Sequence, residues 1–266
     1  MKILGHVFTV LICLLLLGPI AVVIIASFSG DAYLMFPPQS LSLQWYARFL
    51  EDGRWQAALF NSLVTAAMCC VLSTILGFFT GYAFLRGRLR FQPLLMSLVL
   101  MPLIVPSIVT GVAIYFLSVR LDLVGSRVWL AVTHTVIALP IVLIIAQSAL
   151  QGVDPNLERA ALVHGCTRWG VLRRVVLPIA LPGIISAALF AFLASFDELV
   201  IALFVAGVRA QTLPVRIWNS LTLELEPTIA AVSAVLIATT VFILLVDATI
   251  RRLRRTSQTA ATESAR

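Results

Sequence analysis

The sequence predicts an all-α integral membrane protein with six transmembrane helices. Apolar residues make up 61% of the 266 residues and charged residues only 12%, and the mean hydropathy is +1.04. A soluble domain contains about 45–50% apolar and about 25% charged residues. Six apolar stretches are long enough to cross a bilayer as helices, which takes about 20 residues each. Because these stretches are continuous rather than alternating, they favour helices over a β-barrel.

The six stretches lie near residues 7–27, 59–85, 93–117, 128–150, 183–206 and 228–250. The first is too long for the apolar part of a signal peptide and lacks a clear cleavage site, so we expect a retained helix.

We therefore predict three parts of the chain. Residues 1–58 form the first transmembrane helix and an external segment, which includes a short interfacial helix at Trp45–Leu50. Residues 59–250 form a core of five transmembrane helices, with a cytoplasmic loop at 151–182 and an external loop at 207–227. For residues 251–266 we expect a disordered cytoplasmic tail, since the part from Thr256 to Arg266 is small and polar.

The distribution of Lys and Arg predicts the orientation. The chain carries 19 basic and 12 acidic residues, and with both termini in the cytoplasm most basic residues lie on the cytoplasmic side. The bias is sharpest in the short loop that carries Arg86, Arg88 and Arg90. Because basic loops stay inside, we expect both termini in the cytoplasm. The net charge of +7 is then a topology signal, and nothing else in the sequence supports a nucleic-acid partner.

The loop at 151–182 is long for a linker and carries helix signals. Asp154 or Asn156 is a suitable N-cap, Pro155 suits a first helical turn, and Gly165 suits a helix end. Thr167 is a second N-cap candidate, for a short helix at Arg168–Val176 that we expect Pro178 to end. The sequence therefore predicts a helix, a bend and a second helix.

One motif in this loop resembles a known family. Arg159-Ala160-Ala161, Gly165, Val175 and Leu177-Pro178 have the spacing of the E-A-A-x3-G-x9-I-x-L-P motif of inner-membrane permease subunits of binding-protein-dependent ABC importers. Arg159 replaces the usual Glu, although Glu158 directly precedes it.

Other short segments resemble the spermidine/putrescine permease branch of that family. They are Leu43-Gln44-Trp45-Tyr46, Asn61-Ser62, the Pro102 and Pro106 pair, Leu157-Glu158, Ser195-Phe196-Asp197-Glu198 and Leu213–Trp218.

The resemblance implies the type I ABC importer permease (MetI-like) fold in a bacterial inner membrane, and a loop that couples to an ATPase. The coupling residues that it implies are Glu158, Arg159, Ala160, Ala161, Gly165, Leu177 and Pro178. It also implies a second permease subunit, expected to differ from this chain, two ATP-binding subunits and an external solute-binding protein. The solute that it implies is a polyamine such as spermidine or putrescine.

The chain itself lacks the residues of an ATPase. The only lysine is Lys2, ahead of the first span, whereas a P-loop needs a lysine after its glycine-rich turn. We therefore expect a non-catalytic permease subunit with no cofactor, no metal site and no catalytic residues.

Two carboxylates, Asp197 and Glu198, fall inside the fifth apolar stretch. Such charges cost at least about 2.5 kcal/mol by insertion scales and usually face a cavity or a partner. On a continuous helix the two side chains would point about 100° apart, with Glu198 on a face of small residues. We expect the pair to help a cationic solute pass, but a polar contact between helices explains it equally well.

Two other functions remain as alternatives. A stand-alone secondary transporter or channel would use Asp197 and Glu198 with an ion gradient, although the chain shows no repeated halves. A membrane-embedded enzyme would need a nucleophile or metal motif, and neither H-E-x-x-H nor G-x-S-x-G occurs. His134, in the fourth span, is expected to be a packed polar residue, and the prolines in the spans are expected to kink helices.

Overall fold

The computed structural model describes residues 2–31, 36–87, 89–224 and 226–264 of the chain. Within these ranges the side chains of residues 2–4, 223–224 and 251–264 are not described. Helices make up most of the described part, and its only β-structure is one isolated bridge between Ser29 and Leu41.

Five helices among the described residues are long and apolar enough to cross a membrane, and a bent pair of helices is a sixth candidate span. The predicted fold class is therefore confirmed. The bent pair is Gln92–Leu103 and Ser107–Arg120, which meet at an angle of 98°. Pro102 and Pro106 flank this break, as expected of residues that lack a backbone N–H.

The chain divides into two compact units. Unit 1 contains residues 1–59 and 215–242, and unit 2 contains residues 60–214 and 243–266. The sequence instead groups residues 59–250 into one core. Two long helices, α3 (Gly53–Arg86) and α12 (Thr228–Ser264), contribute to both units.

Unit 1 contains α1 (Lys2–Ser27), α2 (Gln44–Glu51), α11 (Leu213–Asn219), of which the part from Val215 on belongs here, and a π-helical turn, Ser220–Glu224. The helix α2 confirms the short helix predicted around Trp45–Leu50. In the segment before α2, Asp31 accepts hydrogen bonds from the backbone N–H of Gln39 and from the Ser29 hydroxyl, which hold the pKa of its carboxyl below the usual value. The region 207–227, predicted as a loop, is largely helical.

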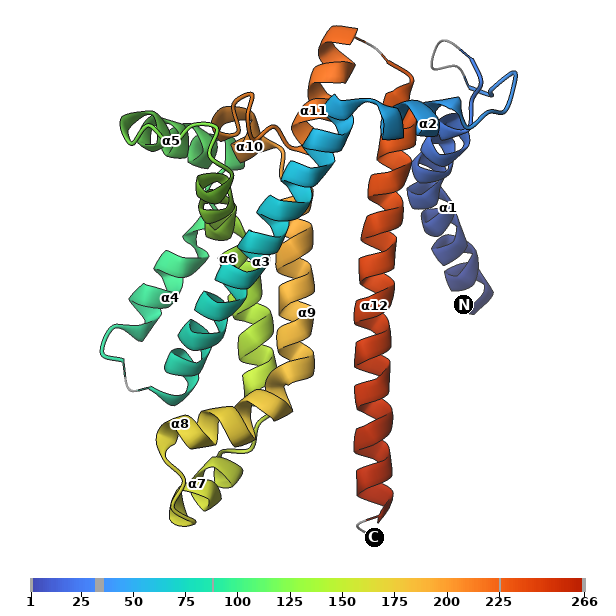
Figure 1. The fold of residues 1–266 in the computed structure, drawn as a ribbon. Helices are drawn as coiled ribbons and strands as arrows, with labels where there is room; N and C mark the ends of the chain where they lie inside the picture. Colours follow the sequence, from blue (N-terminus) through green and yellow to red (C-terminus); the bar gives the residue numbers. More distant parts are fainter. Residues whose placement is uncertain (1, 32–35, 88, 225, 265–266) are drawn as a thin grey trace. The chain divides into compact units, whose positions relative to one another are not determined.

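Unit 2 is built on α6 (Arg127–Gln151) and α9 (Leu177–Phe196), which pack along each other. Figure 1 shows the two short helices α7 (Pro155–Val163) and α8 (Arg168–Val171) at one end of this pair. At the other end, α5 (Ser107–Arg120) packs against α10 (Val200–Val205). The remaining elements are α4 (Gln92–Leu100), the 3-10 turn Met101–Leu103 and a π-helical turn, Leu172–Val176.

Glycine allows α3 and α6 to approach closely. A Cβ atom at Gly77 would lie 2.5 Å from Cγ1 of Val142 and 3.4 Å from the backbone nitrogen of Leu143. Close backbone approach at small residues is a common way to pack membrane helices, because lipid supplies no hydrophobic force between them.

The trace of α12 continues as a helix to Ser264, whereas the sequence predicts a disordered tail from residue 251. The part of α12 apolar enough to span a membrane ends at Ile250. The residues beyond it include Ala, Arg and Gln, which have good helix propensity, and the helix extends through them.

Candidate functional site

The loop between α6 and α9 contains the predicted first helix, now seen as α7. The Asp154 side chain caps it by accepting a hydrogen bond of 2.8 Å from the backbone N–H of Asn156. Pro155 occupies the first helical position, where its missing N–H costs nothing. Gly165 has a φ of +83°, the left-handed conformation that ends helices and that glycine adopts without strain. The predicted cap and helix end are confirmed.

The second helix of the loop begins as predicted but does not end at Pro178. The Thr167 hydroxyl accepts a hydrogen bond of 3.1 Å from the backbone N–H of Gly170 at the start of α8. A π-helical turn, Leu172–Val176, then joins α8 directly to α9. In this wider turn the N–H of Leu177 bonds to the carbonyl of Leu172, five residues earlier. Pro178 therefore lies at the second position of α9, inside a continuous helical stretch that it does not end.

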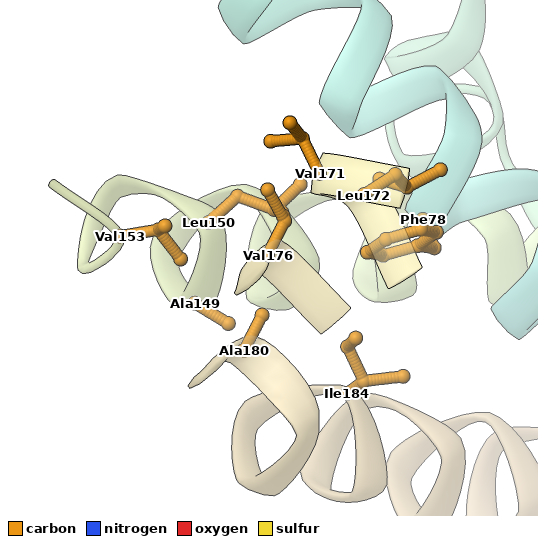
Figure 2. Close-up of a cluster of buried hydrophobic side chains, with 9 residues drawn as sticks. All are labelled: Phe78, Ala149, Leu150, Val153, Val171, Leu172, Val176, Ala180 and Ile184. Carbon is orange, nitrogen blue, oxygen red and sulfur yellow. The ribbon is translucent and has the colours of Figure 1, made fainter. Parts of the chain in front are cut away.

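A cluster of buried apolar side chains fixes the loop to the helix ends. Figure 2 shows it, with members from α3, α6, α8, the π-turn and α9. Its residues are Phe78, Ala149, Leu150, Val153, Val171, Leu172, Val176, Ala180 and Ile184. Ala161, Val175 and Leu177, three residues of the loop motif, pack against this cluster. These motif positions hold the loop in place by burial of apolar surface.

Glu158 also faces into the chain, because it pairs with Arg86 at the end of α3. The Arg86 guanidinium lies 2.8 Å from the Glu158 carboxylate and donates a second hydrogen bond, of 2.9 Å, to the carbonyl of Val153. Glu158 is only 9% exposed. In the sequence Arg86 is a topology signal alone, since no local spacing relates two residues that are 72 positions apart.

The other predicted coupling residues are exposed on the outside of the loop. Arg159, Ala160, Gly165 and Pro178 are exposed, and Val163 is 85% exposed. The structure thus separates the predicted set into residues that anchor the loop, which are Glu158, Ala161 and Leu177, and residues that are free to contact another molecule.

Asp197 and Glu198 do not lie within a continuous helix, so the predicted placement of their faces is wrong. The helix α9 ends at Phe196, and α10 begins at Val200. Glu198 caps the start of α10, accepting hydrogen bonds from the backbone N–H groups of Val200, Ile201 and Ala202 at 2.9–3.2 Å. A carboxylate is well suited to this position, because the N–H groups of a first turn have no partner within the helix.

His134 joins this break to α6. Its Nδ1 lies 2.8 Å from the Ser195 hydroxyl oxygen, and its Nε2 lies 3.7 Å from Oε2 of Glu198. The side chain is buried, with 1% exposed, as expected for a packed polar residue.

The Asp197 side chain differs from those of His134 and Glu198. It is exposed, and none of the described residues forms a hydrogen bond or an ion pair with it. Glu198 is therefore used in folding, whereas Asp197 is available.

The chain combines helices that can span a membrane with a folded loop between two of them, and its sequence matches one family of transport permeases. Residues 73–255 match the family described as binding-protein-dependent transport system inner membrane component. The chain belongs to this family.

Two characterised relatives cover most of the chain. It is 28% identical to the spermidine/putrescine transport system permease protein PotC of Haemophilus influenzae, over 88% of this chain and 91% of that protein. It is 32% identical to the putrescine transport system permease protein PotI of Escherichia coli, over 85% of each chain.

A solved structure shares the fold. A chain of a bacterial ABC transporter that imports the acidic polysaccharide alginate matches with a TM-score of 0.73 and 17% identity, over 92% of this chain and 94% of that chain. The fold is that of type I ABC importer permeases, and the chain is an ABC importer permease subunit.

Proposed function

We propose that this chain forms one half of the path through which an ABC importer passes a small cationic solute of the polyamine class. The names of the relatives PotC and PotI support the solute class. The second half comes from another permease subunit, an external protein delivers the solute, and both termini of the chain lie in the cytoplasm. ATP hydrolysis takes place on a partner subunit.

The observation that carries this proposal is the exposed outer face of an anchored α7. The loop at 151–182 is fixed to the spans by the Arg86–Glu158 pair and by the buried cluster, yet Arg159, Ala160 and Val163 remain exposed. A rigidly mounted but uncovered helix is suited to receive force from a partner. Small residues such as Ala160 and Gly165 let a partner approach the backbone closely.

Deletion of residues 157–166, or the substitution Gly165→Asp, tests the coupling role. We expect the altered chain to insert in the membrane but to lose transport and association with the ATPase. Retained association after the deletion would contradict the proposal. A separate test reconstitutes this chain alone in liposomes, because uptake without any ATPase would support the stand-alone transporter instead.

Asp197 is the residue that we assign to the solute path. A free carboxylate directly after the end of a span attracts a cation, and a charge inside a membrane usually faces a cavity or a partner. The Glu198 carboxylate accepts hydrogen bonds from three backbone N–H groups at the start of α10, so we assign it a structural role. Uptake of labelled putrescine by Asp197→Asn and Glu198→Gln variants tests this assignment: we expect the first to lose uptake and the second to retain most of it if assembly is normal.

A further inference from the structure

The exposed charge on the loop is almost entirely basic. Within residues 154–174 the exposed charged side chains are Arg159, Arg168, Arg173, Arg174 and Asp154. Asp154 is already used to cap α7. The remaining acidic residue, Glu158, is buried against Arg86. The surface that the loop presents to another molecule is therefore positive, although Glu158 lies next to Arg159 in the sequence.

Arg159 lies at the centre of the outer face of α7. Asn156, Arg159, Ala160 and Val163 have the spacing that places residues on one side of a helix, and all four are exposed. None of the described residues forms a hydrogen bond or an ion pair with Arg159. The guanidinium therefore has free hydrogen-bond donors, and it lies between a small residue, Ala160, and an apolar residue, Val163.

This arrangement suits a protein groove better than a lipid surface. A helix that lies on a membrane buries a broad apolar face and keeps its basic residues at the polar side. On α7 the charge of Arg159 shares the face with Val163, so burial of Val163 in lipid would also bring the charge into lipid. A groove with one carboxylate and an apolar floor would satisfy both side chains, because Arg pairs with carboxylates through two parallel hydrogen bonds.

We propose that Arg159 pairs with a carboxylate in an acidic groove on the ATP-binding partner, and that this pair selects the partner by charge. The inference rests on the proposed function, since it specifies the contact that the coupling loop makes. Electrostatic complementarity of this kind contributes more to the choice of partner and to the association rate than to raw affinity. A permease with an acidic residue at this place would be matched to a different ATP-binding subunit.

The test measures binding of the ATP-binding subunit that copurifies with this chain to the permease complex in nanodiscs, at several salt concentrations. We expect Arg159→Glu to weaken binding by about tenfold or more, and Arg159→Gln to weaken it less and to reduce the salt dependence. Arg174→Glu is the matched control, because it makes the same charge change on the positive surface of the loop but outside α7, and so measures the general effect of loop charge. We expect this control to change binding by about threefold or less.

Each other outcome has a distinct meaning. Binding by Arg159→Glu within about twofold of the unmodified chain would overturn the pair, and so would equal losses with Arg159→Glu and Arg174→Glu. A loss confined to binding of anionic vesicles would assign Arg159 to lipid instead. If deletion of residues 157–166 also leaves binding intact, the coupling role itself is wrong. If the deletion abolishes binding but Arg159→Glu does not weaken it, the coupling role stands and only the Arg159–carboxylate pair is wrong. If Arg159→Glu does not fold, Arg159→Gln replaces it: weaker binding with a reduced salt dependence supports the pair, and unchanged binding overturns it.

Discussion

Arg86 and Glu158 form an ion pair of 2.8 Å between the end of α3 and α7, and the two side chains are largely enclosed. The same guanidinium also binds the carbonyl of Val153, which lies between α6 and α7. One side chain thus joins three segments of unit 2. The pair explains how a short loop between two spans keeps a fixed position even where its outer face has no cover.

Loss of this ion pair should loosen the loop. We expect Arg86→Gln and Glu158→Gln each to lower the free energy of unfolding by about 1–3 kcal/mol, because each leaves a charged group with an unmet partner in a mostly buried site. In the double variant the losses should be less than additive, which thermal unfolding of the purified permease can measure. Strictly additive losses would show that the two side chains do not interact.

The left-handed conformation of Gly165 should make this position sensitive to side-chain type rather than to side-chain size. No atom lies within 4 Å of the place where a Cβ would stand, so the cost of substitution is conformational. We expect Gly165→Ala to cost about 1–2 kcal/mol of loop stability, and Gly165→Asn to cost less, because Asn tolerates this conformation. Hydrogen exchange of α7 in the two variants provides the measurement. Equal protection in both would contradict the explanation.

Gly77 should be intolerant of even one methyl group. Its added Cβ would overlap Cγ1 of Val142 at 2.5 Å, so we expect Gly77→Ala to cost about 1–3 kcal/mol. Gly81→Ala is the control on the same helix, since its nearest neighbour would lie at 3.4 Å. The substitution Val142→Ala should partly rescue Gly77→Ala. Absence of rescue in thermal unfolding would mean that the α3–α6 contact is not the cause.

Asp197 and Glu198 should separate in their effects on stability and uptake. We expect Glu198→Ala to lower stability by about 1–2 kcal/mol, because three backbone N–H groups of α10 lose their acceptor. Asp197→Asn should change stability by less than about 0.5 kcal/mol while it lowers polyamine uptake. Thermal unfolding and uptake in the same preparations test both statements. A stability loss for Asp197→Asn equal to that for Glu198→Ala would remove the distinction.

Local signals in the sequence predict the loop well. Asp154, Thr167 and Gly165 each act within a few residues of their position, through caps and a helix end. The apolar stretches likewise predict the spans, because the length needed to cross the bilayer is fixed. The prolines at 102 and 106 also indicate the bend in the third span, where the missing N–H groups weaken the helix.

Features that depend on distant contacts are not predicted. The helix breaks between Phe196 and Val200, inside an apolar stretch that the sequence predicts as one continuous span. The break is evident only from the hydrogen bonds by which Glu198 caps α10 and from the packing of α10 against α5. Arg86 as the partner of Glu158 has no local signature. The π-turn Leu172–Val176 is not predicted either, because Pro178, two residues after it, is usually a sign of a helix end.

The direct helical connection between α8 and α9 has a mechanical consequence. Residues Arg168–Phe196 form one continuous helical stretch of 29 residues, in which the π-turn Leu172–Val176 joins α8 to α9. Because no loop separates the two helices, a displacement of α8 would move α9 directly, and the far end of α9 lies beside Asp197. Work delivered at one face of the membrane would in this way reach the opposite half of the bilayer without any loop having to refold.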